Sequence, residues 1–161
     1  MPARRAIALV GVLLSGACSP ADVRTKPDPP TIGTAALERA VFALVNRHRR
    51  SLGLRPLADD SAITRQARLH SAAMAGGKTP LGHSGFDDRV TTLRRVLAAR
   101  RTAENVAFNQ GHRDPAEVAV RGWLASRGHR ENIEGAYDLT GVGVASNAKG
   151  EVYFTQIFVG R

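Results

Sequence analysis

Cysteine is almost absent from this sequence, which has 161 residues and a single thiol, at Cys18. One thiol excludes an intramolecular disulfide and every zinc site that is built from several thiolates. A metal site would therefore have to use the five histidines and the carboxylates. Aromatic residues are also scarce, at 5% of the chain, and none alternates with the arginine clusters as a base-stacking surface requires. Although the formal net charge is +9, we therefore expect no nucleic-acid partner.

The common nucleotide and hydrolase motifs are missing as well. The sequence contains no phosphate-binding loop, no dinucleotide fingerprint and no Gly-x-Ser-x-Gly nucleophile elbow. Its length and its apolar fraction of 43% are sufficient for one domain with a hydrophobic core.

Residues 1–17 have the layout of a secretory signal peptide. A short positive start at Arg4-Arg5 precedes an uncharged, mostly apolar stretch that is too short to span a bilayer. Small residues then end at Cys18, and this ending resembles the bacterial lipobox, whose cysteine is lipidated and becomes the mature N-terminus. We expect a lipoprotein signal peptide at residues 1–17 and a chain that is exported and anchored to a membrane through Cys18. An ordinary signal peptide would instead leave Cys18 as a free thiol.

Residues 18–33 contain four prolines in a polar run and are expected to form an extended tether. The folded domain is expected at residues 34–161. Apolar residues at helical spacing predict four helices, at residues 34–52, 60–75, 87–99 and 114–128.

Local signals refine two of these helices. Thr34 and Gly53 are the expected cap and stop of the first helix, and Asp114-Pro115 with Glu117 is a strong start signal for the fourth. Arginines 47, 49 and 50 are expected on a solvated face, where they suit the negative end of the helix dipole.

The end of the chain changes to the period of a β-strand. Residues 140–146 and 151–159 predict a terminal hairpin, and short strands at 81–83 and 105–108 could join it. Helices come first and strands close the chain, so we expect an α+β domain with helices packed on both faces of a small antiparallel sheet.

The histidines differ in their surroundings. His48 and His70 lie on apolar helix stripes and are expected in or near the core, as is Trp123, whereas His112 is expected in solvent. His83 and His129 each follow a glycine at a junction between elements, where side chains can converge on a cleft.

Glu104 is the carboxylate expected to lie with these two histidines. Two imidazoles and one carboxylate are the ligand set of a catalytic zinc site, and Glu104 could alternatively act as a general base on water. Spacing alone gives no metal motif, and Glu104 could also simply accept hydrogen bonds from loop amides.

An ordered set of motifs resembles the CAP superfamily, which includes cysteine-rich secretory, antigen and pathogenesis-related proteins. The set spans about residues 35–160 and is most similar to the compact, disulfide-free SCP-like bacterial branch. Its members in this sequence are Leu44-Val45-Asn46, Gly53-Leu54, Pro56-Leu57, His70-Ser71, His83-Ser84, Glu104-Asn105, Trp123, Gly128-His129-Arg130, Asn132-Ile133 and Gly141-Val142-Gly143.

The resemblance implies a three-layer α-β-α sandwich with a cleft of two histidines and two acids that in some members binds zinc or magnesium. By position, His83, Glu104 and His129 match three of these residues and are the expected metal ligands, with Zn²⁺ as the expected metal. Two positions depart from the pattern: Ser126 stands in place of the second acid, and Ala103 replaces the usual glycine before Glu104.

The expected function is that of a non-enzymatic binding module in the cell envelope, whose cleft holds a metal ion, a small ligand, a lipid or an envelope polymer. The alternative is a metal-assisted, peptidase-like hydrolase with Glu104 as general base. A third hypothesis assigns the positive charge to attraction toward anionic phospholipid or envelope polymers.

Overall fold

The computed structural model describes residues 33–161, so the expected signal peptide, Cys18 and nearly all of the tether lie outside the described residues. The elements are α1 (Thr34–Ser51), β1 (Ala58–Asp59), α2 (Ser61–Ala75), α3 (Phe86–Arg94), β2 (Arg101–Gln110), α4 (Pro115–Ala125), α5 (Arg127–Glu134), β3 (Leu139–Ser146) and β4 (Glu151–Gly160). In this part of the chain, no helix combines the length and the apolar character needed to cross a bilayer.

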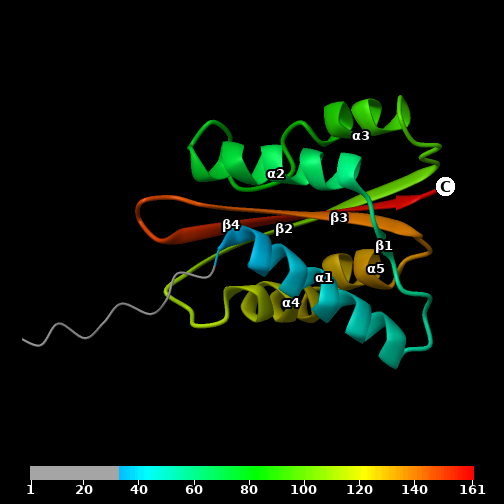
Figure 1. The fold of residues 1–161 in the computed structure, drawn as a ribbon, viewed down its shortest axis with the longest axis horizontal. Helices are drawn as coiled ribbons and strands as arrows, with labels where there is room; N and C mark the ends of the chain where they lie inside the picture. The colour runs from blue at the N-terminus through cyan, green and yellow to red at the C-terminus, as the bar shows by residue number, and fades with distance from the viewer. Residues whose placement is uncertain (1–32) are drawn as a thin grey trace, which may run out of the picture.

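A four-stranded sheet in the order β1-β3-β4-β2 forms the middle layer (Figure 1). The pairs β3–β4 and β4–β2 are antiparallel, and the two-residue β1 adds a parallel pair with β3. Helices α2 and α3 cover one face, and α1, α4 and α5 cover the other. The expected α+β class and the α-β-α sandwich are therefore confirmed, with one short parallel strand added.

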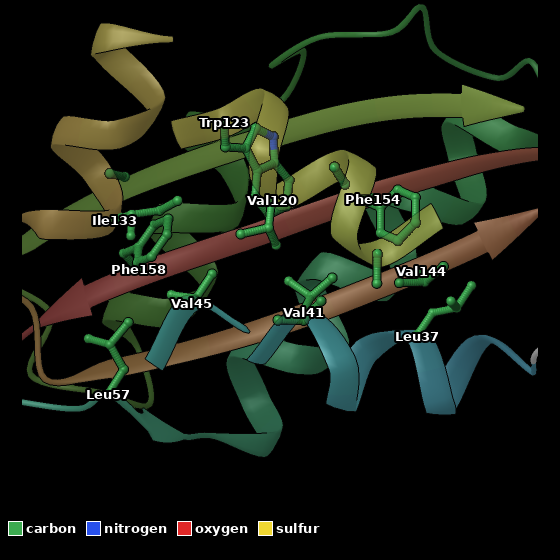
Figure 2. Close-up of a cluster of buried hydrophobic side chains, with 14 residues drawn as sticks. Leu37, Val41, Val45, Leu57, Val120, Trp123, Ile133, Val144, Phe154 and Phe158 are labelled. Atoms are coloured by element: carbon green, nitrogen blue, oxygen red, sulfur yellow. The ribbon is translucent and has the colours of Figure 1, made fainter. Parts of the chain in front are cut away.

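Each face of the sheet buries its own hydrophobic cluster. Between the sheet and α1, α4 and α5 the largest buried side chains are Trp123, Phe154 and Phe158, packed against Val41 and Val45 (Figure 2). Trp123 is therefore in the core, as expected, and its Nε1 donates to the carbonyl oxygen of Val106. On the α2–α3 face a smaller cluster consists of Ile63, Ala67, Leu93, Leu139, Ile157 and Val159.

Helix α2 packs directly on β3 because two glycines of the strand face it. A Cβ atom on Gly141 would collide with the backbone of Thr64, and one on Gly143 would collide with the backbone of Arg68. The alternation of glycine and valine in β3 has a steric explanation. The glycines let α2 approach the strand closely, and the valines pack in the hydrophobic cluster on the other face of the sheet.

The first two helices agree with the sequence patterns in extent. Helix α1 begins at Thr34, although Gly33 occupies the N-cap position and no side chain caps it, and the left-handed Gly53 (φ 71°) follows its end. Asp60 caps α2 by accepting hydrogen bonds from the amides of Ala62 and Ile63.

The prediction for the third helix is wrong at its end. Helix α3 stops at Arg94 instead of residue 99, because the chain must turn back to enter β2. The amide of Arg100 already donates to the carbonyl of Gly160 in the last strand.

The fourth predicted helix is two helices. Helix α4 ends at Ala125 and α5 follows at once. Helix α5 buries only Ile133, so it has no apolar periodicity from which it could be predicted. Asp114 precedes α4 as expected, but its side chain makes no capping hydrogen bond.

Two strand predictions also need correction. Residues 81–83 form a loop, in which Gly82 has a φ of 144°, and the strand at 105–108 is the middle of the longer β2. The terminal hairpin of β3 and β4 is confirmed.

Arg49 is buried, which contradicts the expected solvated face. Its side chain donates hydrogen bonds to four backbone carbonyls, those of Arg55, Ile133, Gly135 and Tyr137, and only 2% of the residue is exposed. These bonds tie the end of α1 to the loop that follows it, to α5 and to the segment between α5 and β3. Burial also lowers the pKa of the Arg49 guanidinium.

Candidate functional site

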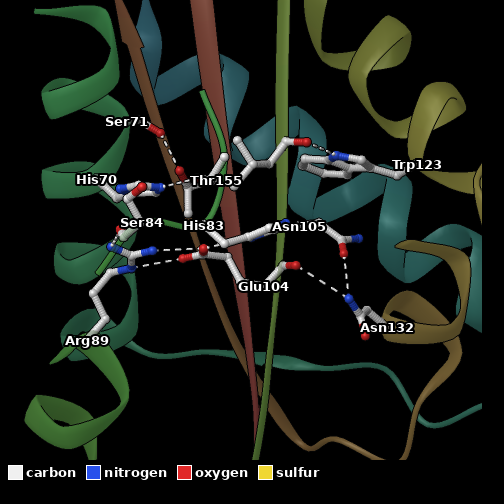
Figure 3. Close-up of polar contacts among 12 residues, drawn as sticks. His70, Ser71, His83, Ser84, Arg89, Glu104, Asn105, Trp123, Asn132 and Thr155 are labelled. Atoms are coloured by element: carbon white, nitrogen blue, oxygen red, sulfur yellow. Dashed lines mark hydrogen bonds and ion pairs between the residues drawn. The ribbon is translucent and has the colours of Figure 1, made fainter. Parts of the chain in front are cut away.

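Glu104 lies near the start of β2, on the sheet face that α2 and α3 cover, and Arg89 of α3 reaches it directly (Figure 3). Arg89 Nε is 2.9 Å from Glu104 Oε2, and Arg89 Nη2 is 2.8 Å from Glu104 Oε1. The side chain of Arg89 is 10% exposed and that of Glu104 is 1% exposed, so the ion pair is almost completely shielded from solvent. Both carboxylate oxygens are therefore engaged by one guanidinium.

His83 contacts the same carboxylate from the loop between α2 and α3. Its Nδ1 lies 3.0 Å from Glu104 Oε1, so Nδ1 donates to the carboxylate and Nε2 is the nitrogen left for other partners. The His83 side chain is 53% exposed, in contrast to the buried acid. An oriented imidazole with one free nitrogen at the surface is suited to binding a polar group.

Two buried groups hold the loop that carries His83. His70 Nε2 lies 2.7 Å from the carbonyl oxygen of Gly82, and Arg89 Nη1 lies 2.9 Å from that of Ser84. His70 is buried, as expected, and its burial lowers the pKa of its imidazole. The structure thus gives this histidine a role in shaping the site, which its place on an apolar stripe did not reveal.

His129 belongs to α5, and amide side chains hold this helix against β2. Asn105 Nδ2 donates to the carbonyl of His129 over 3.0 Å, and Asn132 Nδ2 donates to Asn105 Oδ1 over 2.9 Å. Burial, followed by the nearby charge of His83, lowers the pKa of His129. The lowered pKa favours the neutral form of the His129 imidazole, and the charge of His83 contributes to this shift.

The expected zinc ligands do not all fit a metal as they stand. The structure joins His83 to Glu104, and the charge of His83 acts on His129, but Arg89 occupies both oxygens of Glu104. Among the described residues, no group of three or more His, Cys, Asp or Glu side chains is arranged to hold a metal ion. A zinc ion on His83, Glu104 and His129 would thus require the guanidinium to leave, and the zinc site stays a prediction.

The functional residue that sequence reasoning missed is Arg89. Its position four residues before the buried Leu93 places both on one face of α3, and this is the only signal that indicates an inward side chain. Ser126, at the position of the second acid, is partly buried at the N-cap of α5.

A three-layer sandwich with a histidine–glutamate pair at its edge strand defines a class of proteins, and a comparison with family models identifies it. The cysteine-rich secretory protein family, CAP, matches residues 42–158. The chain belongs to this family.

Individual relatives agree. The chain is 33% identical over 133 residues to the uncharacterized protein YkwD of Bacillus subtilis (strain 168), in a match that covers 79% of this chain and 48% of that protein. It is 28% identical to an extracellular SCP-domain protein of Bacillus anthracis, with a TM-score of 0.63 over 80% of this chain and 41% of that one. This chain thus spans about half the length of these relatives or less.

A third relative shares the fold. An outer surface protein of Borrelia burgdorferi is 19% identical, with a TM-score of 0.69 over 81% of this chain and 96% of that one.

Proposed function

We propose that this chain is an exported, lipid-anchored binding module of the bacterial cell envelope, whose cleft beside His83 and His129 binds a polar ligand. The predicted signal peptide and the lipobox-like Cys18 support export and anchoring. The Bacillus anthracis and Borrelia burgdorferi relatives are described as extracellular and outer-surface proteins, which agrees with that location.

The bidentate ion pair between Arg89 and Glu104 is the observation that favours a binding function over a hydrolytic one. A general base must reach the proton that it removes, and Glu104 is 1% exposed with both oxygens engaged. The two imidazoles remain as groups that can meet a ligand. Since the lowered pKa of His129 favours its neutral form and His83 offers Nε2, the cleft suits a ligand that carries hydroxyl or amide groups, such as an envelope polymer.

Co-sedimentation with insoluble peptidoglycan tests this function. The full chain should pellet with the polymer, and the double variant H83A/H129A should lose most of that binding. The variant H112A is the matched control, because His112 is an exposed histidine outside the cleft. Equal pelleting of the native chain and the double variant would contradict a role for the cleft.

Anchoring is tested separately, by following the chain in fractionated bacterial cells. The native chain should be found with the membranes, and the variant Cys18→Ala should not. If both chains stay with the membranes, lipidation of Cys18 is not the anchor.

A groove of about 390 Å³ between α1 and α4 favours a lipid as the second candidate ligand. Leu44, Val120 and Leu124 give it an apolar lining, and Arg47 and Arg121 could pair with an acidic headgroup. A fluorescent fatty acid should bind the native chain and bind Leu124→Glu at least about tenfold more weakly, because a buried carboxylate opposes an apolar tail. Equal affinities would argue against the lipid.

The hydrolase is the alternative function. It assigns the activation of water to Glu104, with Zn²⁺ held by His83 and His129. It requires that Glu104→Gln abolish turnover of a peptide substrate while zinc binding is retained. Turnover that survives this substitution, or that survives chelation, would exclude it.

A further inference from the structure

We propose that Arg89 is the resident cation of the cleft: its guanidinium occupies the place opposite Glu104 that a metal ion would take, so the cleft is organised without a metal. This inference concerns the same residues as the proposed binding site and deepens that proposal.

The first support is the geometry of the pair. Two parallel bonds of 2.9 and 2.8 Å join the guanidinium fork to the two oxygens of Glu104. This bidentate arrangement is the strongest form of ion pair that a protein makes, and it uses both coordinating atoms of the carboxylate. Glu104 therefore has no oxygen that is free of Arg89.

The second support is that the rest of the guanidinium is also engaged. Its third donor, Nη1, lies 2.9 Å from the carbonyl oxygen of Ser84, and its central carbon lies 5.9 Å from the centre of the Phe86 ring. Arg89 thus connects α3, the His83 loop and β2 at once. A metal ion that displaced it would break three hydrogen bonds and would have to leave the arginine unpaired.

The third support is the charge balance of the buried groups. Glu104 contributes one negative charge, its side chain is 1% exposed, and the cation of Arg89 already balances it. A divalent ion at the same carboxylate would lie within a few ångströms of the guanidinium, where repulsion in a poorly solvated site is strong. His83 and Arg89 both contact Oε1 of Glu104. The carboxylate that orients His83 therefore has Arg89 as its counterion, in place of a metal ion.

Thermal unfolding of the untagged full chain, with and without Zn²⁺ at about 100 μM, tests the inference. The Tm of the native chain should change by no more than about 1 °C with zinc or with a chelator. The variant Arg89→Met should unfold roughly 10 °C lower or more, because it leaves the Glu104 carboxylate buried without a counterion. Adding Glu104→Gln to this variant should restore at least about half of the loss, because it removes that charge.

The zinc response of the variants gives a second readout. Arg89→Met frees the carboxylate beside His83, so zinc should raise its Tm by about 3 °C or more, and His83→Ala in the same background should remove that rise. The conservative variant Arg89→Lys keeps the cation and should show no change of Tm with zinc. If Arg89→Met does not fold, the comparison of Arg89→Lys with the native chain still tests the inference.

The inference is overturned if zinc stabilises the native chain as much as it stabilises Arg89→Met. It is also overturned if zinc stabilises the native chain and Arg89→Lys alike, or if Glu104→Gln brings no recovery in the Arg89→Met background. Because no envelope polymer is added, these outcomes are independent of whether the cleft binds one.

Discussion

Gly143 of β3 lies directly against the backbone of Arg68 in α2, with no room between them for a single methyl group. The contact places α2 on the sheet at a depth that also lets Ser71 Oγ donate to the carbonyl of Gly143 over 2.9 Å. Because His70 precedes Ser71 on the same helix, the depth of α2 also sets the position of the loop that carries His83. A glycine in a strand thereby acts on the position of His83 beside Glu104.

Substituting Gly143 with alanine should therefore destabilise the domain by about 3 kcal/mol or more, since the helix backbone cannot yield as a flexible side chain would. Urea unfolding measures this loss. Gly122 is the matched control: it lies inside α4 with open space around it, so Gly122→Ala should stabilise the domain by about 0.5–1 kcal/mol. A Gly143→Ala variant as stable as the native chain would show that α2 can move off the sheet.

Arg49 and Arg50 are neighbours on α1 with opposite surroundings. Arg49 is buried with four carbonyl partners, whereas Arg50 is exposed. Arg49→Met should cost about 3 kcal/mol of unfolding free energy, because it leaves the buried carbonyls without donors. Arg50→Met should stay within about 0.5 kcal/mol of the native value. Similar effects of the two substitutions in urea unfolding would mean that the carbonyl contacts of Arg49 contribute little.

Acid should weaken the fold through His70. Burial lowers the pKa of His70 below its value of about 6.5 in an unfolded chain, so the unfolded state binds the proton more tightly. Stability is then fully present above that value and falls as the pH drops below it. The urea midpoint of the native chain should therefore decrease between about pH 7.5 and pH 5.5.

The variant His70→Gln separates this effect from that of other groups, because glutamine can still donate to Gly82 but does not titrate. It should show a smaller decrease than the native chain, and the exposed-site control His112→Gln should show the native decrease. Some dependence on pH should remain, since the pKa of His129 is lowered as well. An unchanged decrease in His70→Gln would exclude His70 as its source.

An arginine-rich segment that runs from α3 into β2 is the part of the domain to which we assign the predicted attraction to anionic surfaces. Residues 89–103 contain no Asp or Glu, and four exposed arginines lie there, at positions 94, 95, 100 and 101. Replacing all four with glutamine should weaken binding to vesicles of phosphatidylglycerol by at least about tenfold, since each cation near an anionic surface contributes about 1 kcal/mol. Sedimentation of the Cys18→Ala chain measures this binding without a lipid anchor.

The matched control replaces four exposed arginines elsewhere with glutamine, those at positions 39, 50, 65 and 113, so both variants carry the same net charge. Equal losses in the two variants would assign the attraction to the net charge as a whole. Binding that does not change between low salt and about 0.5 M salt would exclude electrostatic attraction.

The sequence was most informative where structure depends on neighbours along the chain. The extents of α1 and α2 and the β3–β4 hairpin agree with the local patterns, although the side-chain caps expected at Thr34 and Asp114 do not form. The resemblance to the CAP superfamily implied that His83 and Glu104 share a site, and their side chains lie 3.0 Å apart. Helix α5 was not predicted, because it buries only one apolar side chain. Its position against β2 depends on hydrogen bonds from the side-chain amides of Asn105 and Asn132.

The sequence patterns by themselves determined the terminal hairpin and the buried tryptophan, and the resemblance to the CAP superfamily implied the three layers. The tertiary structure decided what the charged residues do. The sequence around Arg49 and Arg89 does not reveal what they bind, because Ile133, a partner of Arg49, and Glu104, the partner of Arg89, lie 84 and 15 residues away along the chain. Periodicity and capping act over a few residues, whereas the partner of a buried charge is fixed only when distant segments pack together and exclude water. For this reason the carboxylate that the motifs suggest as a metal ligand is, in the folded domain, the partner of an arginine.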